Sequence, residues 1–123
     1  FDIEQTVALF ELDLARLLPH VPERRQASAV PRYPAVEQDL AVVVDSAVEA
    51  GALQAVVEGS PLVAEARVFD VYRGEQLPEG KKSVAHSIRY QAADRTLTTD
   101  DANAEQAKLL ERLKREFGAE LRV

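Results

Sequence analysis

Apolar residues recur at strand spacing in four stretches of the chain after residue 35. The segment 39–44 (DLAVVV) is β-branched and apolar, which is typical of a central strand. Residues 63–72 and 83–90 alternate between apolar and polar side chains, and the turn-rich stretch between them contains Pro78 and Gly80. This pattern predicts an antiparallel hairpin. A short last strand is predicted over 119–123.

Two stretches between these strands have helical spacing. The first, 47–58, follows a possible Asp45-Ser46 cap and ends at Gly59-Ser60-Pro61. Its apolar residues lie on one side: Val48, Leu53, Val56 and Val57.

The second helix is predicted over 100–117. Thr98 precedes Asp101 by three residues, a variant of the capping box, and Gly118 is a C-terminal stop. The predicted apolar stripe consists of Ala107, Leu110, Leu113 and Phe117.

The predicted order of elements is therefore β-α-β-β-α-β. This is an α+β, ferredoxin-like plan, in which two helices cover one face of a four-stranded antiparallel sheet. The other face must be solvated or occupied by a partner, so candidate functional residues are sought there.

The first 30 residues do not fit this plan. Residues 7–14 alternate like a strand, and residues 1–18 are interpreted as the end of a preceding domain, with Asp13 capping a short helical turn. Residues 19–34 contain four prolines, which is typical of an extended connector. We expect a division into 1–30 and 31–123, and the absence of Met suggests a piece of a longer chain.

Composition removes several classes of function. The 123 residues contain no Cys, which excludes disulfides, thiolate nucleophiles and cysteine-based metal sites. The net charge of −6 argues against nucleic-acid binding by bulk electrostatics, so any such site must be local. The two histidines have no metal-ligand spacing, and we expect no metal. With no stretch long enough to span a membrane, a soluble cytoplasmic setting is expected.

Strand alternation predicts which side chains point away from the helices. The predicted outward sets are Asp39, Ala41 and Val43; Val68, Asp70 and Tyr72; and Ser83, Ala85, Ser87 and Arg89. An aromatic ring, an acid, hydroxyls and a guanidinium thus share one surface, as on sheets that stack and read unpaired RNA bases. His86 alternates with Val84 and Ile88, which predicts a hydrogen-bonded histidine on the helix-covered face.

Three segments are similar to a known family: RYPAVEQDLAVVVD (32–45), VFDVYRGEQLPEGKKSVAHSIRYQ (68–91) and RTLTTDDANAEQAKLLERLKREFGAELR (95–122). Together they resemble the C-terminal ferredoxin-fold anticodon-binding domain of bacterial phenylalanyl-tRNA synthetase β subunits. The resemblance implies binding to the anticodon stem-loop of tRNA-Phe, with catalysis in an α subunit of an α2β2 assembly that uses ATP and Mg. It implies neither catalytic residues nor a cofactor for this chain itself.

The resemblance also implies roles for individual residues. By motif position, Tyr72 would stack on an anticodon base, and Asp70 and Ser83 would bond to the edge of the first anticodon guanine. Candidate contacts to the RNA backbone are Arg32, Arg73, Lys81, Lys82 and Arg89. Gln38-Asp39 stands where the family commonly has Arg-Asp, which removes one candidate phosphate contact.

Other interpretations remain open at this point. Tyr72 could be a half-buried packing residue, and Asp70 could pair with Arg89 across the hairpin. The open face could instead serve a protein-interaction or ligand-sensing domain, with an apolar patch of Ala41, Val43, Val68 and Ala85. A small ferredoxin-like hydrolase would need an anion-cradling loop with Arg and Asn, whereas the only Asn, Asn103, lies in the second predicted helix.

Overall fold

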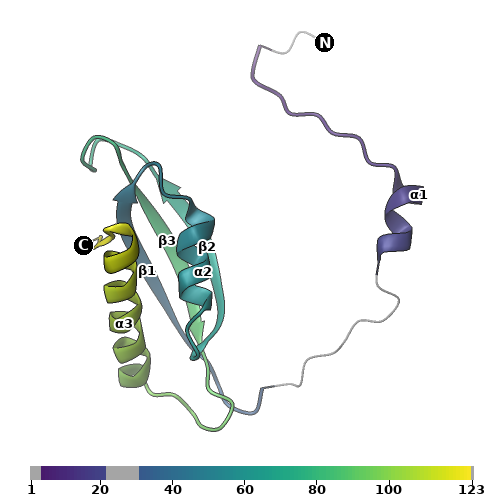
Figure 1. Ribbon diagram of the computed structural model, residues 1–123. Helices are drawn as coiled ribbons and strands as arrows, with labels where there is room; N and C mark the ends of the chain where they lie inside the picture. The colour runs from purple at the N-terminus through teal and green to yellow at the C-terminus, as the bar shows by residue number, and fades with distance from the viewer. Residues whose placement is uncertain (1–3, 22–30, 123) are drawn as a thin grey trace. The chain divides into compact units, whose positions relative to one another are not determined.

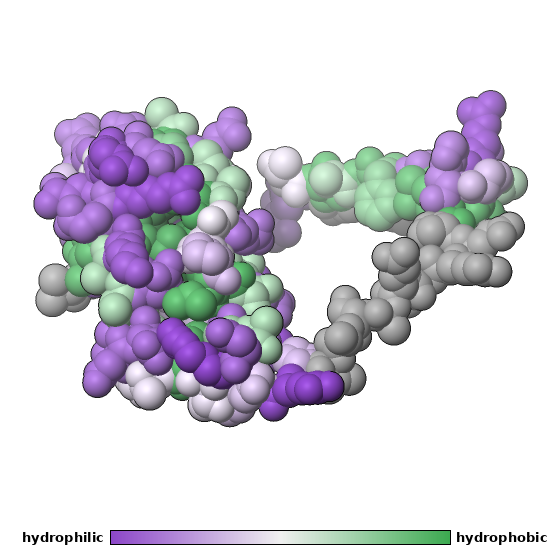
Figure 2. Space-filling model, turned by 60° about the horizontal axis from the view of Figure 1, so that its bottom comes forward, coloured by the Kyte–Doolittle hydropathy of each residue, from purple (hydrophilic) through white to green (hydrophobic). Residues whose placement is uncertain are grey.

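The computed structural model describes residues 4–21 and 31–122, which fall into two units, Phe1–Val30 and Pro31–Val123. In the first unit, Asp13 caps the short helix α1 (Leu14–Leu17) as predicted, and the 3-10 turn η1 (Leu18–His20) follows (Figure 1). The strand predicted within 7–14 does not form, because a strand requires a partner and no described residue pairs with this segment. Its apolar side chains lie uncovered in Figure 2. Most of the predicted connector, residues 22–30, lies outside the described residues.

The second unit has the predicted β-α-β-β-α-β order. Its elements are β1 (Val36–Asp45), α2 (Ala50–Glu58), β2 (Val63–Tyr72), β3 (Lys81–Tyr90), α3 (Thr99–Phe117) and β4 (Glu120–Leu121). The sheet order is β2-β3-β1-β4, and every neighbouring pair is antiparallel. Figure 1 shows α2 and α3 on the same side of the sheet, which confirms the predicted layers.

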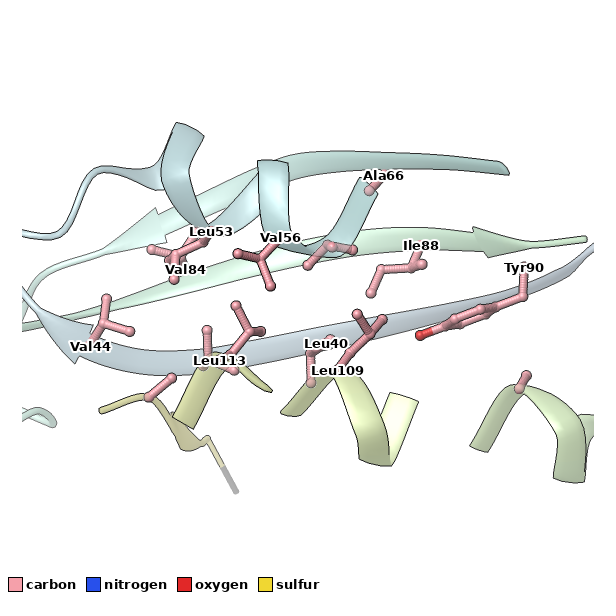
Figure 3. Packing of buried hydrophobic residues seen from close by; sticks show 14 of the residues in the cluster. Leu40, Val44, Leu53, Val56, Ala66, Val84, Ile88, Tyr90, Leu109 and Leu113 are labelled. Carbon is pink, nitrogen blue, oxygen red and sulfur yellow. The ribbon is translucent and has the colours of Figure 1, made fainter. Parts of the chain in front are cut away.

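The core fills the space between the helices and the sheet (Figure 3). Its fully buried members include Leu40, Val42 and Val44 of β1, Leu53 and Val57 of α2, Val84 and Ile88 of β3, and Leu113 of α3. These apolar groups stabilise the fold by leaving water, and they fix one face of β1, β2 and β3 toward the helices. The opposite face is left open.

The buried stripe of α3 differs from the predicted one. Ala107 is exposed, whereas Ala102, Glu105 and Leu109 are buried beside Leu113. Glu105 is buried although it is charged, because the Ser60 hydroxyl donates a hydrogen bond to its carboxylate and the Lys108 Nζ lies 3.1 Å from the other oxygen. A paired carboxylate can be buried at a position where an unpaired one could not.

The helix ends follow the sequence in part. The capping box between Thr98 and Asp101 is present, and Gly118 adopts φ 63°, the left-handed conformation that ends α3. The predicted Asp45-Ser46 cap is wrong for α2, because the Asp45 carboxylate accepts from the Ala47 amide in a turn before the helix. Helix α2 begins after Glu49 with no side-chain cap.

His86 lies on the helix-covered face, as predicted, and its side chain is fully buried. Its ring nitrogens make no hydrogen bond of normal geometry within the described residues, although the backbone of Leu40 is near enough to act on the ring. Burial lowers the pKa of His86, and the backbone of Leu40 opposes this only in part. His86 is therefore a neutral core residue near pH 7.

Candidate nucleic-acid interface

The open face of the sheet is organised in rows of register partners across β1, β3 and β2. Val43, Ser83 and Tyr72 form one row, and Ala41, Ala85 and Asp70 form the next. Side chains of register partners point to the same face of a sheet. The three residues expected to contact an anticodon base are therefore brought together by two adjacent strands.

A β-bulge in β2 corrects one member of the predicted face. The register shifts between Val68 and Asp70, so Val68 pairs with His86 and packs against the core, while Asp70 pairs with Ala85. The extra residue, Phe69, stays exposed outside both sets. Without the bulge, Asp70 and Tyr72 would alternate in step with Val68, as the sequence prediction assumed.

Tyr72 is held between two neighbours. A Cβ at position 74 would lie 2.3 Å from the Tyr72 hydroxyl oxygen, so the end of the ring rests directly on Gly74. The Arg122 guanidinium stands over the ring, 4.8 Å from its centroid, and is 3.5 Å from the Gln76 side-chain oxygen. The ring is therefore positioned by the loop that follows β2 and covered by the segment that follows β4.

Ser83 and Asp70 differ sharply in accessibility. Ser83 is 1% exposed, and its hydroxyl has no hydrogen-bond partner within the described residues, whereas Asp70 is exposed. Tyr72 opposes Ser83 directly in the register, and Arg122 stands over the Tyr72 ring. An unpartnered buried hydroxyl is costly, and a ligand that reaches it can recover that cost.

The candidate backbone contacts do not form one cluster. Arg73 and Lys81 flank the loop beside Tyr72, whereas Arg32 and Arg89 lie toward the opposite end of the sheet. Lys82 is on the helix-covered face, 5% exposed, and donates to the Ser46 carbonyl. This geometry disfavours Lys82 as a phosphate contact.

Two of the open alternatives lose support from the geometry. Arg89 lies 3.5 Å from Glu65, not beside Asp70, so no pair across the hairpin explains Asp70. The apolar patch of a protein-interaction face lacks Val68, which packs on the core, and Ala85 is 9% exposed.

Sequence reasoning missed Gly74 and Arg122. Gly74 lies two residues after Tyr72 in the FDVYRG segment, where a glycine by itself indicates only a turn. Its φ is not positive, so the requirement is space for the ring rather than backbone conformation. Arg122 carries no local signal, because its position over Tyr72 depends on the pairing of β4 with β1.

The described parts of the chain also bear on metal and membrane binding. Within residues 4–21 and 31–122, no three His, Asp or Glu side chains are grouped so that they could hold a metal ion. None of the described helices has the length and apolar character needed to cross a bilayer.

Comparison with known proteins identifies the fold family. The family model described as a ferredoxin-fold anticodon binding domain matches residues 31–122. The phenylalanine–tRNA ligase beta subunit of Geobacillus kaustophilus is 44% identical over 124 residues, which cover 99% of this chain and 15% of that protein. The corresponding subunit of Anaeromyxobacter dehalogenans is 46% identical over 116 residues, with 94% and 14% covered. That of Bacillus subtilis is 42% identical, with 98% and 15% covered.

The chain thus spans about 15% of the length of the curated relatives that it matches. The family match, by contrast, covers nearly all of the second unit, including every strand of the open face. The chain therefore belongs to the family of ferredoxin-fold anticodon-binding domains.

Proposed function

We propose that this chain is the anticodon-binding part of a phenylalanyl-tRNA synthetase β subunit, and that its open sheet face binds the anticodon stem-loop of tRNA-Phe. The observation that carries the proposal is the convergence of Tyr72, Asp70 and Ser83 in two adjacent register rows. Phenylalanine attachment, with ATP and Mg, then belongs to the α subunit of an α2β2 assembly in the cytoplasm, and this chain supplies recognition only.

Stacking on Tyr72 requires an exchange of partners. In the free chain the Arg122 guanidinium lies over the Tyr72 ring. A cation–π contact at an exposed site contributes about 0.5–1 kcal/mol, whereas base–aromatic stacking contributes about 1–3 kcal/mol. Replacement of the guanidinium by a base is therefore favourable on these magnitudes.

A base stacked on Tyr72 also lies beside two polar groups that can read its edge. Ser83 is the register partner of Tyr72, and its hydroxyl, which has no partner within the described residues, can donate to or accept from a base edge. The Asp70 carboxylate accepts only, which suits the N1 and N2 protons of guanine. The two side chains thus favour guanine over bases that present acceptors at the same positions.

Positive charge beside this site is local, as the net charge of −6 requires. Arg73 and Lys81 stand next to Tyr72 and are proposed to bind phosphates close to the stacked base, and Arg32 and Arg89 lie toward the other end. Phosphate contacts of this kind position the RNA without reading its sequence. Lys82 is left out of the proposal because its ammonium is buried and donates to Ser46.

A titration tests the proposal. The 123-residue chain is titrated against a labelled tRNA-Phe anticodon stem-loop and against a loop whose first anticodon base is changed. We expect a preference for the native loop that Tyr72→Ala removes, with a loss of affinity worth about 1–3 kcal/mol. Phe69→Ala is the matched control, because Phe69 is an exposed aromatic of the same strand that has no register partner on β3. Equal binding of both loops by the unaltered chain would contradict the proposal.

A further inference from the structure

The open face continues past Asp70 into a charged region, of which only Arg89 is a candidate contact to the RNA backbone. In the register, Asp39, Ser87 and Arg67 form the next row, and Glu37, Arg89 and Glu65 the one after it. Five of these residues line a hollow of about 210 Å³: Glu37, Glu65, Arg67, Ser87 and Arg89. The residues of the hollow belong to three paired strands, so the sheet fixes the positions of their backbones.

The polar groups of the hollow are only partly used by the protein. The Arg89 Nε is buried and has no partner within the described residues, and its Nη1 is 3.5 Å from Glu65, a long contact. Glu37 and Arg67 form no ion pair with any other described residue. The hollow therefore offers both donors and acceptors to a ligand.

The charges of the hollow decide what kind of group fits. Two carboxylates offset two guanidinium groups, so the lining is neutral overall. A phosphate would meet carboxylates as well as guanidinium groups, which weakens its binding. A nucleobase is neutral, and a base with an amino group beside a ring acceptor matches a carboxylate beside a guanidinium.

We propose that this charged hollow is a second base-reading subsite, which receives an amino-bearing base close to the one stacked on Tyr72. The proposal rests on the proposed function, since it extends the same RNA-binding face. Four residues of strand separate Ser83 from Ser87, which is about 13 Å. Stacked nucleotides rise about 3.4 Å each. The hollow is thus within about four nucleotides of the Tyr72 site.

The test uses Glu37→Ala, because base reading and simple electrostatics predict opposite signs. Removal of a negative charge strengthens binding to any polyanion if charge alone acts. If the carboxylate accepts from a base amino group, Glu37→Ala removes that acceptor and weakens binding to the native stem-loop, by about fivefold or more. Alanine is used rather than glutamine, because a glutamine keeps an acceptor oxygen and can itself bond to an amino-bearing base. Glu111→Ala is the matched control, because it makes the same change at an exposed position of α3.

The RNA probes are the native stem-loop and loops in which one amino-bearing base near the first anticodon position is changed to uracil. We expect the Glu37→Ala loss on the native loop to vanish on one of the uracil loops, which lacks that amino donor. Stronger, unchanged or uniformly weaker binding of Glu37→Ala to every loop would overturn the second subsite. Tyr72→Ala is measured in the same series. If it leaves the native loop unaffected, the proposed function itself fails. If only Glu37→Ala gives a result other than the expected one, the second subsite alone fails.

Discussion

Replacement of Gly74 by alanine is expected to weaken RNA binding while leaving the fold almost as stable as before. The added Cβ would lie 2.3 Å from the Tyr72 hydroxyl oxygen and 2.6 Å from its Cζ. Real Cβ atoms essentially never approach a neighbour closer than 3.0 Å, so the end of the ring must move away from position 74. The displaced atoms belong to the far end of one side chain, so the backbone need not follow.

The consequence for binding follows from that shift. A base and a ring stack only when their faces are aligned, and a ring displaced from Gly74 loses its fixed place beside Ser83. We expect Gly74→Ala to lose much of the stacking energy that Tyr72→Ala loses, about 1–3 kcal/mol. The free energy of unfolding should change by less than about 1 kcal/mol.

A double-mutant cycle on stem-loop affinity measures whether Gly74 acts through Tyr72. Gly74→Ala and Tyr72→Ala should be non-additive, so that the double variant binds about as weakly as Tyr72→Ala alone. Gly51→Ala is the matched control, since nothing lies within 4 Å of its added Cβ. Additive losses, or full affinity in Gly74→Ala, would refute this reasoning.

Three further predictions concern stability and charge. Ser60→Ala should lower the free energy of unfolding, measured in urea, by about 1–3 kcal/mol, because the buried Glu105 carboxylate loses a donor. An unchanged free energy of unfolding would show that Lys108 alone satisfies this carboxylate. The pKa of His86 is lower in the folded chain than its ordinary 6.5, so the unfolded chain binds more protons there and stability should fall as the pH drops below about 6.5. Thermal unfolding across pH 5–7 should lose this dependence in His86→Leu, and an unaltered slope would argue against it. Lys81→Ala should reduce the slope of log RNA affinity against log salt concentration by about one, because one phosphate contact is lost. Lys82→Ala should lower thermal stability and leave that slope nearly unchanged, because Lys82 donates to the Ser46 carbonyl. A reduced slope for Lys82→Ala and an unchanged slope for Lys81→Ala would contradict the proposed role of Lys81.

The sequence predicts the fold well where hydrophobic periodicity and turn chemistry agree. The strand 63–72 has the predicted bounds, and the Thr98–Asp101 capping box and Gly118 place α3 within one residue. The failures have physical causes. The predicted α3 stripe omits Glu105, because burial of that carboxylate depends on Ser60, which is distant in sequence. The N-terminal strand needs a partner that the described residues do not provide.

The candidate site was predictable from alternation only as far as the strands are regular. Asp70, Tyr72 and Ser83 lie on the open face as expected, but the bulge after Val68 reverses the side on which that residue points. Strict alternation of side chains assumes a regular strand, and nothing in the sequence of β2 marks the position of the bulge. The position of Arg122 over Tyr72 likewise depends on tertiary structure.

The central claim is that the open face, and not the helix-covered face, binds the anticodon loop. Mapping of backbone amide chemical shifts during addition of the native stem-loop tests this claim most directly. The account predicts shifts along residues 70–74, 81–89 and at Arg122, with the exposed faces of α2 and α3 little affected. Shifts concentrated on α2 and α3, with Tyr72 and Ser83 unchanged, would contradict it.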